Sequence, residues 1–302
     1  MENNLSDKNE NKGRKGRGVS HSKIILMGEH SVVYGYPAIA IPLKNIRMEC
    51  IVERATVPFV HNKKDTLSTA IYTALNYLNR KNENIKYKVI SDIPPKRGMG
   101  SSAAVSIAAI RGVLDYFNTE VDNLTLEKLV NEAEIIAHNT PSGLDAKTCL
   151  SDSAIKFIKN KGFKNLEMNL GAYLLIADTG IHGHTRDAIM NIKNMGDRAL
   201  PMLEKLGKLT EETEKFIEKK DVINIGKNMI SAHGELKKLG VSIEKSDVLV
   251  KTAIDEGAYG AKMSGGGLGG CIIALMESRE KAEMTGKKLM EKGAVNIWIE
   301  AL

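Results

Sequence analysis

Apolar side chains recur along this chain with two different spacings, which predict a mixture of helices and strands. Stretches with the three-to-four-residue spacing of a buried helix face are 66–79, 102–117, 125 to the approach of Pro141, much of 185–239, 245–256 and 278–292. Short apolar or alternating stretches typical of strands are 23–27, 46–52, 87–93, 172–177, 261–263, 271–276 and 295–299. Because both kinds occur in both halves, the pattern predicts an α+β fold.

The length of 302 residues predicts two domains. A glycine- and lysine-bearing stretch, 162–171, precedes the apolar run at 172, and we place the boundary there. The predicted domains are therefore 19–167 and 168–302. Thr125 is the expected cap of the helix that begins beside it.

The first 20 residues carry five basic and three acidic side chains and almost nothing to bury. Residues 1–18 are therefore predicted to be a disordered basic tail. A nucleic-acid arm is the alternative, but no aromatic side chains are interleaved with the charges. We expect no nucleic-acid partner.

Composition narrows the class of protein. Hydrophobic residues make up 42% and charged residues 26%, which is ordinary for a globular protein, and the net charge of +6 suits an anionic substrate. No apolar run approaches the roughly 18 residues that a membrane helix needs, so we expect no membrane partner. The start of the chain is polar, and three scattered cysteines form no C-x-x-C pair. These features favour reduced thiols and a cytoplasmic location.

The first segment with candidate chemistry is 94–104, Pro-Pro-Lys-Arg-Gly-Met-Gly-Ser-Ser-Ala-Ala. It comes after a predicted strand and opens a predicted helix. Its glycines allow a ligand close to the backbone, and the N–H groups at a helix N-terminus favour an anion. It is not a Walker A loop, because G-x-x-x-x-G-K-[ST] is absent. A capped helix after a proline turn is an equally good interpretation of this segment alone.

A second segment, 262–271, is Lys-Met-Ser-Gly-Gly-Gly-Leu-Gly-Gly-Cys. Although 265–270 fits G-x-G-x-x-G, the apolar run at 271–276 resembles a strand rather than a helix, which excludes a dinucleotide fold. A glycine loop against phosphates and a plain hairpin turn remain, and the five glycines favour the loop.

Two further segments carry polar groups. A strand from Lys23 feeds the turn Gly-Glu-His-Ser-Val-Val-Tyr-Gly at 28–35, which places a cation, a carboxylate and an imidazole together. Glu134 lies near a helix end, and Asp145 comes after a tight turn. Two such carboxylates can divide labour between a metal and a reacting hydroxyl. Taken singly, each of these residues is better explained as surface charge or a helix cap.

Taken together and in this order, the four segments resemble the GHMP kinases. The quoted blocks are those at 28–35, 98–104, 141–145 (Pro-Ser-Gly-Leu-Asp) and 262–271. The first block is most similar to the members that phosphorylate mevalonate, and the resemblance spans residues 20 to 302. It implies an N-terminal domain like domain 2 of ribosomal protein S5, a ferredoxin-like C-terminal domain and an active site in the cleft between them.

The resemblance also implies ATP and Mg²⁺ as cofactors, mevalonate as the small-molecule partner and phosphorylation of its C5 hydroxyl. The implied ATP-binding residues are Pro94, Arg97, Gly98, Met99, Gly100, Ser101, Ser102 and Ala103. The implied metal ligands are Ser102 and Glu134, and the implied catalytic residues are Asp145 and Lys23. The implied substrate-binding residues are Glu29, His30, Thr185, Gly265, Gly266 and Gly267. A homodimer is left open.

Some positions depart from the family pattern. Val105 stands where animal members have a tyrosine, and His184 stands where a small polar residue is common. These departures leave open another kinase of the family, acting on phosphomevalonate, a sugar or homoserine. A protein that keeps the fold but only binds ligand is a different class. The presence of Lys23, Ser102, Glu134 and Asp145 argues against it.

Overall fold

The computed structural model describes residues 13–138 and 143–302, which form two compact units that interleave along the chain. The described residues of the first unit are 13–22, 44–93, 100–138 and 143–150. Those of the second unit are 23–43, 94–99 and 151–302. These units differ from the predicted domains 19–167 and 168–302. Residues 23–43, 94–99 and 151–167 fall in the predicted N-terminal domain but belong to the second unit.

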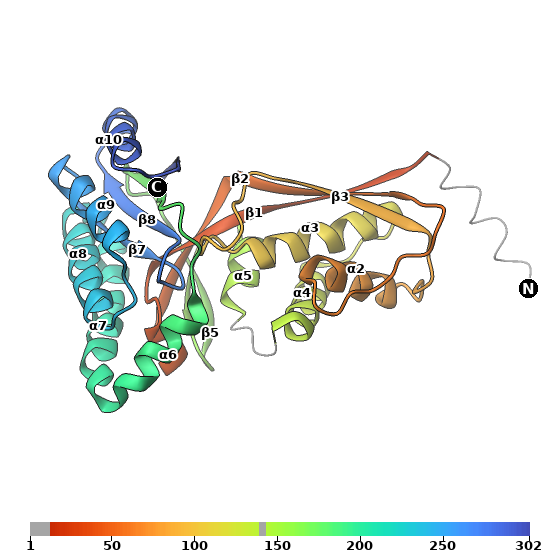
Figure 1. Cartoon of the computed structure of the whole chain (residues 1–302), viewed down its shortest axis with the longest axis horizontal. Coiled ribbons are helices and arrows are strands. Elements are labelled where there is room, and N and C mark those ends of the chain that lie inside the picture. Colours follow the sequence, from red (N-terminus) through yellow and green to blue (C-terminus); the bar gives the residue numbers. More distant parts are fainter. Residues whose placement is uncertain (1–12, 139–142) are drawn as a thin grey trace, which may run out of the picture. The chain divides into compact units, whose positions relative to one another are not determined.

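The first unit is a sheet with helices on one face (Figure 1). Its strands are β1 (Lys15–Met27), β2 (Ala38–Arg54) and β3 (Ile85–Ser91), of which β1 and β2 continue into the second unit. Its helices are α2 (Thr66–Tyr77), α3 (Ser101–Tyr116), α4 (Asn123–His138) and α5 (Leu144–Leu150). Strand β3 is antiparallel to β2, with Met48 opposite Ser91. The apolar faces predicted at 66–79 and 102–117 are those that α2 and α3 bury against each other.

The start of β1 corrects the prediction of a disordered tail over 1–18. Residues 1–12 lie outside the described residues, but the strand begins at Lys15. Its buried positions alternate with exposed ones and are occupied by Gly16, Gly18 and Ser20. A Cβ on Gly18 would lie 2.0 Å from the Ala108 carbonyl oxygen of α3. The strand therefore runs against the helix backbone with no side chain in between.

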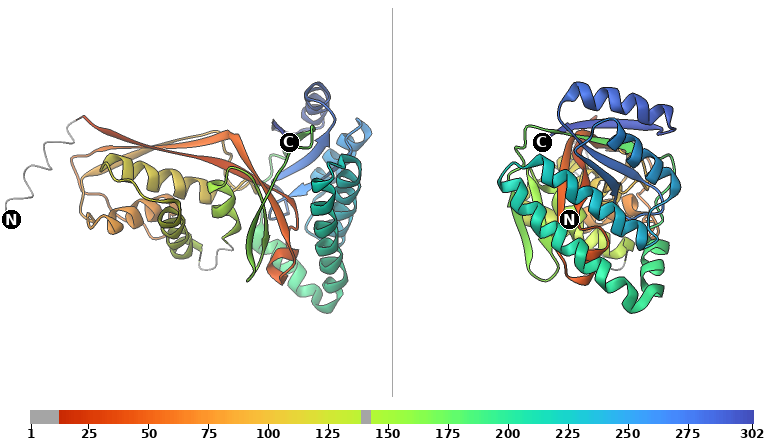
Figure 2. Two further views of the ribbon diagram at one scale, coloured as in Figure 1. Left: turned by 180° about the vertical axis from the view of Figure 1, so that it is seen from behind. Right: turned by 90° about the vertical axis from the view of Figure 1, so that its left-hand side faces the viewer.

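The second unit contains an antiparallel sheet in the order β7-β8-β6-β9. Its strands are β6 (Tyr173–Asp178), β7 (Gly260–Ser264), β8 (Cys271–Met276) and β9 (Asn296–Ala301). Its helices are α6 (Thr185–Met195), α7 (Leu200–Glu218), α8 (Val222–Lys238), α9 (Glu244–Asp255) and α10 (Arg279–Glu291), and Figure 2 shows them from two further sides. Helices α9 and α10 bury an apolar core with the sheet that includes Leu175, Leu249, Ile272 and Leu289.

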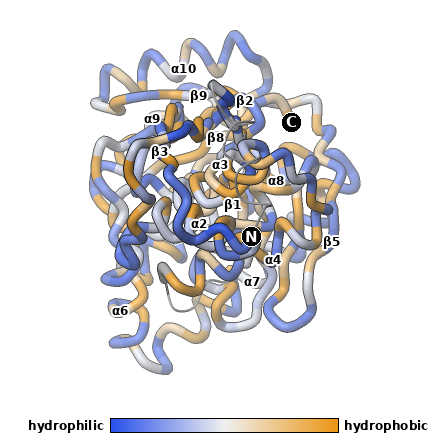
Figure 3. Tube along the Cα trace, turned by 90° about the vertical axis from the view of Figure 1, so that its right-hand side faces the viewer, coloured by the Kyte–Doolittle hydropathy of each residue, from blue (hydrophilic) through white to orange (hydrophobic). Residues whose placement is uncertain are grey.

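Helix α10 illustrates how the charge pattern fits the fold. Its buried residues are Ala282, Thr285, Gly286 and Leu289, and charged side chains occupy most other positions. The hydropathy along its trace alternates accordingly, at the top of Figure 3. Ser278 caps the helix by accepting a hydrogen bond from the Lys281 N–H.

Further elements differ from the prediction. Strands β4 (Ala154–Ile158) and β5 (Gly162–Leu166) form a hairpin, and β5 lies in the stretch 162–171 that the sequence predicts to be an interdomain boundary. Helix α5 was not predicted, and Asp145 is its second residue. The Asp122 carboxylate accepts the Thr125 N–H, so Asp122 rather than Thr125 takes the capping position at the start of α4.

Candidate active site

Helix α3 provides an N-terminus in the first unit. Gly100 precedes it with a φ of 70°, a conformation that glycine adopts without a side-chain clash. The helix has 16 residues and begins at Ser101, so the N–H groups at its start point back along the axis. An anion is favoured there by these N–H groups and by the helix dipole.

The predicted metal ligands Ser102 and Glu134 are in direct contact. Glu134 comes from α4, is 6% exposed, and accepts hydrogen bonds at Oε1 from Ser102 Oγ (3.0 Å) and Ser106 Oγ (2.9 Å). Ser106 was missed from the sequence. It lies four residues after Ser102 on the same helix face, and that spacing was the available signal.

Asp145 is the second residue of α5 and is partly buried. Its backbone is therefore fixed by the first turn of a helix. Pro141 and Ser142 of the same sequence block lie outside the described residues.

The second unit holds a buried ion pair between Glu29 and Lys262. Both side chains are 0% exposed, and Lys262 Nζ donates to Glu29 Oε1 and, over 2.8 Å, to the Met263 carbonyl. Burial raises the pKa of Glu29, and the positive charges of Lys262 and Lys23 oppose that rise. Burial likewise lowers the pKa of Lys262, and Glu29 opposes that fall. Lys262 was not singled out in the sequence.

His30 is next to Glu29 and has a strained backbone conformation, with a φ of 60°. The side chain is 7% exposed, and burial, reinforced by Lys262, lowers its pKa to about 4. The imidazole is therefore neutral near pH 7. Two buried atoms of this turn, Glu29 Oε2 and His30 Nε2, have no hydrogen-bond partner among the described residues.

The glycine loop 265–270 lies over this turn within the second unit. A Cβ on Gly267 would be 3.4 Å from His30 Nε2, and a Cβ on Gly266 would be 1.8 Å from Thr185 Oγ1. The His184 N–H donates to the Gly267 carbonyl over 3.0 Å. The predicted substrate-binding residues are therefore neighbours in space, although they come from three distant parts of the sequence.

The segment 94–99 also belongs to the second unit and touches the glycine loop. A Cβ on Gly265 would lie 2.8 Å from Gly98 Cα. The Lys23 N–H donates to the Met99 carbonyl over 3.2 Å, and the Gly183 N–H donates to the Lys96 carbonyl over 2.9 Å. Only glycine at 98 and 265 allows the two loops to lie backbone to backbone.

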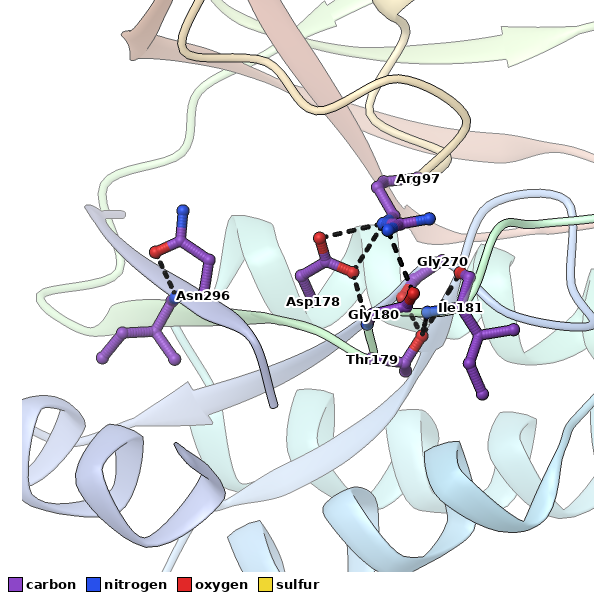
Figure 4. A network of polar contacts seen from close by, with 8 residues as sticks. Arg97, Asp178, Thr179, Gly180, Ile181, Gly270 and Asn296 are labelled. Atoms are coloured by element: carbon purple, nitrogen blue, oxygen red, sulfur yellow. Dashed lines mark hydrogen bonds and ion pairs between the residues drawn. The ribbon is translucent and has the colours of Figure 1, made fainter. Parts of the chain in front are cut away.

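Arg97 holds this segment in place (Figure 4). Its Nε donates to Asp178 Oδ2 over 2.9 Å and lies 2.7 Å from Oδ1 in the same ion pair, and its Nη2 donates to the Gly180 carbonyl over 3.1 Å. Arg97 was predicted to bind ATP, and the structure adds a structural role through Asp178. Asp178 is the last residue of a buried strand and gave no signal in the sequence.

We expect Asp178→Asn to lower the free energy of unfolding by about 1.5–3 kcal/mol, because the buried guanidinium loses a charged acceptor. The side chains of Arg97 and Asp178 are only 11% and 4% exposed, so solvent would not replace that acceptor. Thermal or urea unfolding measures the change. Asp255→Asn, which removes an exposed partner of Lys251, is the matched control and should change stability by less than about 1 kcal/mol. Equal stability of the two variants would contradict this role for Asp178.

Two family models cover both parts of the chain. The GHMP kinases N terminal domain matches residues 68–152, and the GHMP kinases C terminal domain matches residues 213–293. The chain belongs to the GHMP kinase family. The resemblance stated from the four sequence segments and the two-domain α+β fold are thereby confirmed, and ATP is the co-substrate of this kinase family.

Known kinases align with the chain over nearly its whole length. The mevalonate kinase of Pyrococcus furiosus is 31% identical over 306 residues, which cover 89% of this chain and 91% of that protein. The crystal structure of the Methanococcus jannaschii mevalonate kinase superposes with a TM-score of 0.84 at 25% identity, covering 96% of this chain and 99% of that one. Lactococcus lactis galactokinase superposes with a TM-score of 0.73 at 18% identity, covering 95% and 92%, which shows the shared fold alone.

Within residues 13–138 and 143–302, every helix is too short or too polar to cross a bilayer.

Proposed function

We propose that this GHMP kinase transfers the γ-phosphoryl group of ATP to the C5 hydroxyl of mevalonate. The observation that carries the proposal is the alignment with mevalonate kinases over about nine-tenths of both chains. The buried turn at Glu29 and His30 supports it, because its two unpartnered polar atoms suit a polyhydroxy substrate better than an apolar one.

The residues at Glu134 fit Mg²⁺. This ion prefers hard oxygen ligands and is commonly bound by one or two carboxylates together with substrate phosphates. The described residues contain no group of three or more His, Cys, Asp and Glu side chains placed to hold a metal, and such a group is not required here. Ser102 and Glu134 would hold the ion, which supplies positive charge to the β- and γ-phosphates.

The chain's own groups have separate roles in this proposal. N–H groups from Gly100 to Ser102 bind phosphate oxygens at the start of α3. Asp145 orients the attacking hydroxyl and accepts its proton late in the reaction, because an alcohol is a weak acid. Lys23 stabilises the negative charge on the transferring group.

An ADP-release assay with a panel of acceptors tests the proposal. The panel is mevalonate, phosphomevalonate, galactose and homoserine, each with ATP and Mg²⁺. We expect the highest kcat/KM with mevalonate. A higher kcat/KM with another acceptor would identify the protein as a different kinase of the same family. No ADP release with any acceptor would favour a protein that only binds ligand.

We expect Glu134→Gln to weaken the binding of Mg²⁺ more than the binding of mevalonate. The amide keeps the shape of the side chain and loses the charge that a hard cation prefers. A Mg²⁺ titration at saturating ATP should show a shift of about tenfold or more in the half-saturating concentration. Glu132→Gln, an exposed change on the same helix, is the control. An unchanged titration would leave Glu134 as a hydrogen-bond acceptor for Ser102 and Ser106 without a role at the metal.

The same proposal includes a cytoplasmic location. It is supported by Cys50, Cys149 and Cys271, which are buried and form no disulfide among the described residues. A homodimer stays a prediction that light scattering can test.

A further inference from the structure

Lys262 is the largest fully buried side chain of the described residues, and no role in the reaction has been assigned to it. It lies in β7, whose five residues are all buried. Its ammonium donates to one carboxylate, that of Glu29, and to one carbonyl, that of Met263. A lysine without any solvent contact is rare unless it is paired, so the pairing with Glu29 is what allows it there.

Lys262 contacts only one of the two oxygens of the Glu29 carboxylate. Oε1 accepts from Lys262, whereas Oε2 is buried and has no partner among the described residues. A buried carboxylate oxygen without a donor is unfavourable, and a ligand hydroxyl would supply that donor. A ligand carboxylate would be repelled by Glu29 at this atom. The open atom therefore favours an alcohol over a carboxylate.

His30, the next residue in the chain, carries a second buried atom of this kind. Its Nε2 has no partner within the described residues, and a Cβ on Gly267 would lie 3.4 Å from it. As a neutral imidazole, His30 can either donate to or accept from a hydroxyl at Nε2. A hydroxyl is therefore a suitable partner for each of the two atoms.

We propose that Lys262 is a positioning residue that keeps Glu29 ionised and oriented, so that Glu29 Oε2 accepts a hydrogen bond from a hydroxyl of the substrate. The proposal rests on the proposed function for the identity of that substrate. The groups whose charges act on Glu29 are Lys262 and Lys23, with His30 adjacent in the chain. Without Lys262, the buried carboxyl would be expected to take up a proton, which makes it a weaker acceptor and adds an O–H donor.

A double-mutant cycle with Lys262→Met and Glu29→Gln tests this role. We expect Lys262→Met to raise the KM for mevalonate about tenfold or more, with the KM for ATP changed less than about threefold. In the Glu29→Gln background, Lys262→Met should add less than about twofold, because the amide needs no counter-charge. The double variant has no unpaired buried charge and is expected to fold even if the single variant does not. Lys251→Met, an exposed change, is the control.

Infrared difference spectra give a readout that does not depend on turnover. A protonated carboxyl band should appear in Lys262→Met and be absent from the wild type and from the double variant. Absence of this band in folded Lys262→Met, or additive effects of the two substitutions on KM, would overturn the proposal. If the wild type prefers another alcohol of the panel, the same double-mutant cycle is measured with that alcohol. An error in the proposed substrate is thereby distinguished from an error in the role of Lys262. No turnover with any alcohol would overturn both.

Discussion

Asp145→Asn is expected to reduce kcat by at least about 100-fold while the KM for ATP stays close to that of the wild type. An orienting or general-base carboxylate typically contributes on the order of 10²–10⁴-fold. The amide has nearly the same shape as the carboxylate. The start of α5 packs through the buried Leu144 and Ala146, which the substitution leaves in place, so the fold should survive. Steady-state kinetics with both substrates varied measures the two parameters.

Asp92→Asn, an exposed change in the same unit, controls for the loss of one negative charge. A wild-type kcat in Asp145→Asn would refute the assignment. A reduced kcat would show that Asp145 acts in the reaction, and the pH dependence of kcat would then separate proton acceptance from orientation.

Gly18→Ala is expected to destabilise the protein by about 3 kcal/mol or more, at the upper end of the usual cost of overpacking. The new Cβ would lie 2.0 Å from the Ala108 carbonyl oxygen and 2.2 Å from the Gly112 backbone nitrogen. Neither contact is with a flexible side chain that could turn away, so the strand and the helix must separate. A fall in Tm of at least about 5 °C should result.

Gly234→Ala is the matched control for this change. Gly234 lies inside α8, and a Cβ there meets nothing within 4 Å. Alanine is favoured over glycine in a helix interior by about 1 kcal/mol, so this variant should be equally stable or more stable. If both variants melt together, the strand and the helix are not in contact over Gly18.

The prediction of a tail failed at Lys15–Gly18 for a physical reason. Hydrophobic periodicity reveals a strand only when the buried positions carry apolar side chains. Here two of the buried positions are glycines, and the exposed ones include Arg17. The stretch therefore looks like a polar linker, although its backbone at Gly16 and Gly18 packs directly against the backbone of α3.

The missed hairpin has a different cause. In β5, four of the five residues are exposed, and the strand lies at the edge of its sheet with only β4 as a neighbour. Such a strand is specified by pairing rather than by burial, and pairing is not visible as a local pattern. By contrast, α2 and α3 bury wide apolar faces, and their predicted bounds were correct within two residues.

The candidate site likewise contains residues that a local pattern reveals and residues that only the fold reveals. The glycine loops, Ser102 and Asp145 stand in short motifs that can be recognised locally, and Glu134 was assigned through the resemblance those motifs carry. Lys262 and Asp178 act through partners more than 80 residues away, Glu29 and Arg97 respectively. Each looks like an ordinary strand residue in the sequence, because only the fold brings its partner to it.

The interleaving of the two units has a consequence for synthesis on the ribosome. The second unit needs residues 23–43, which are made early, and β9 (Asn296–Ala301), which pairs with β6 and is made much later. The early segment must therefore wait until its partners, such as Lys262 for Glu29, have been translated. Chains stalled before residue 296 cannot complete this unit and should be strongly dependent on chaperones.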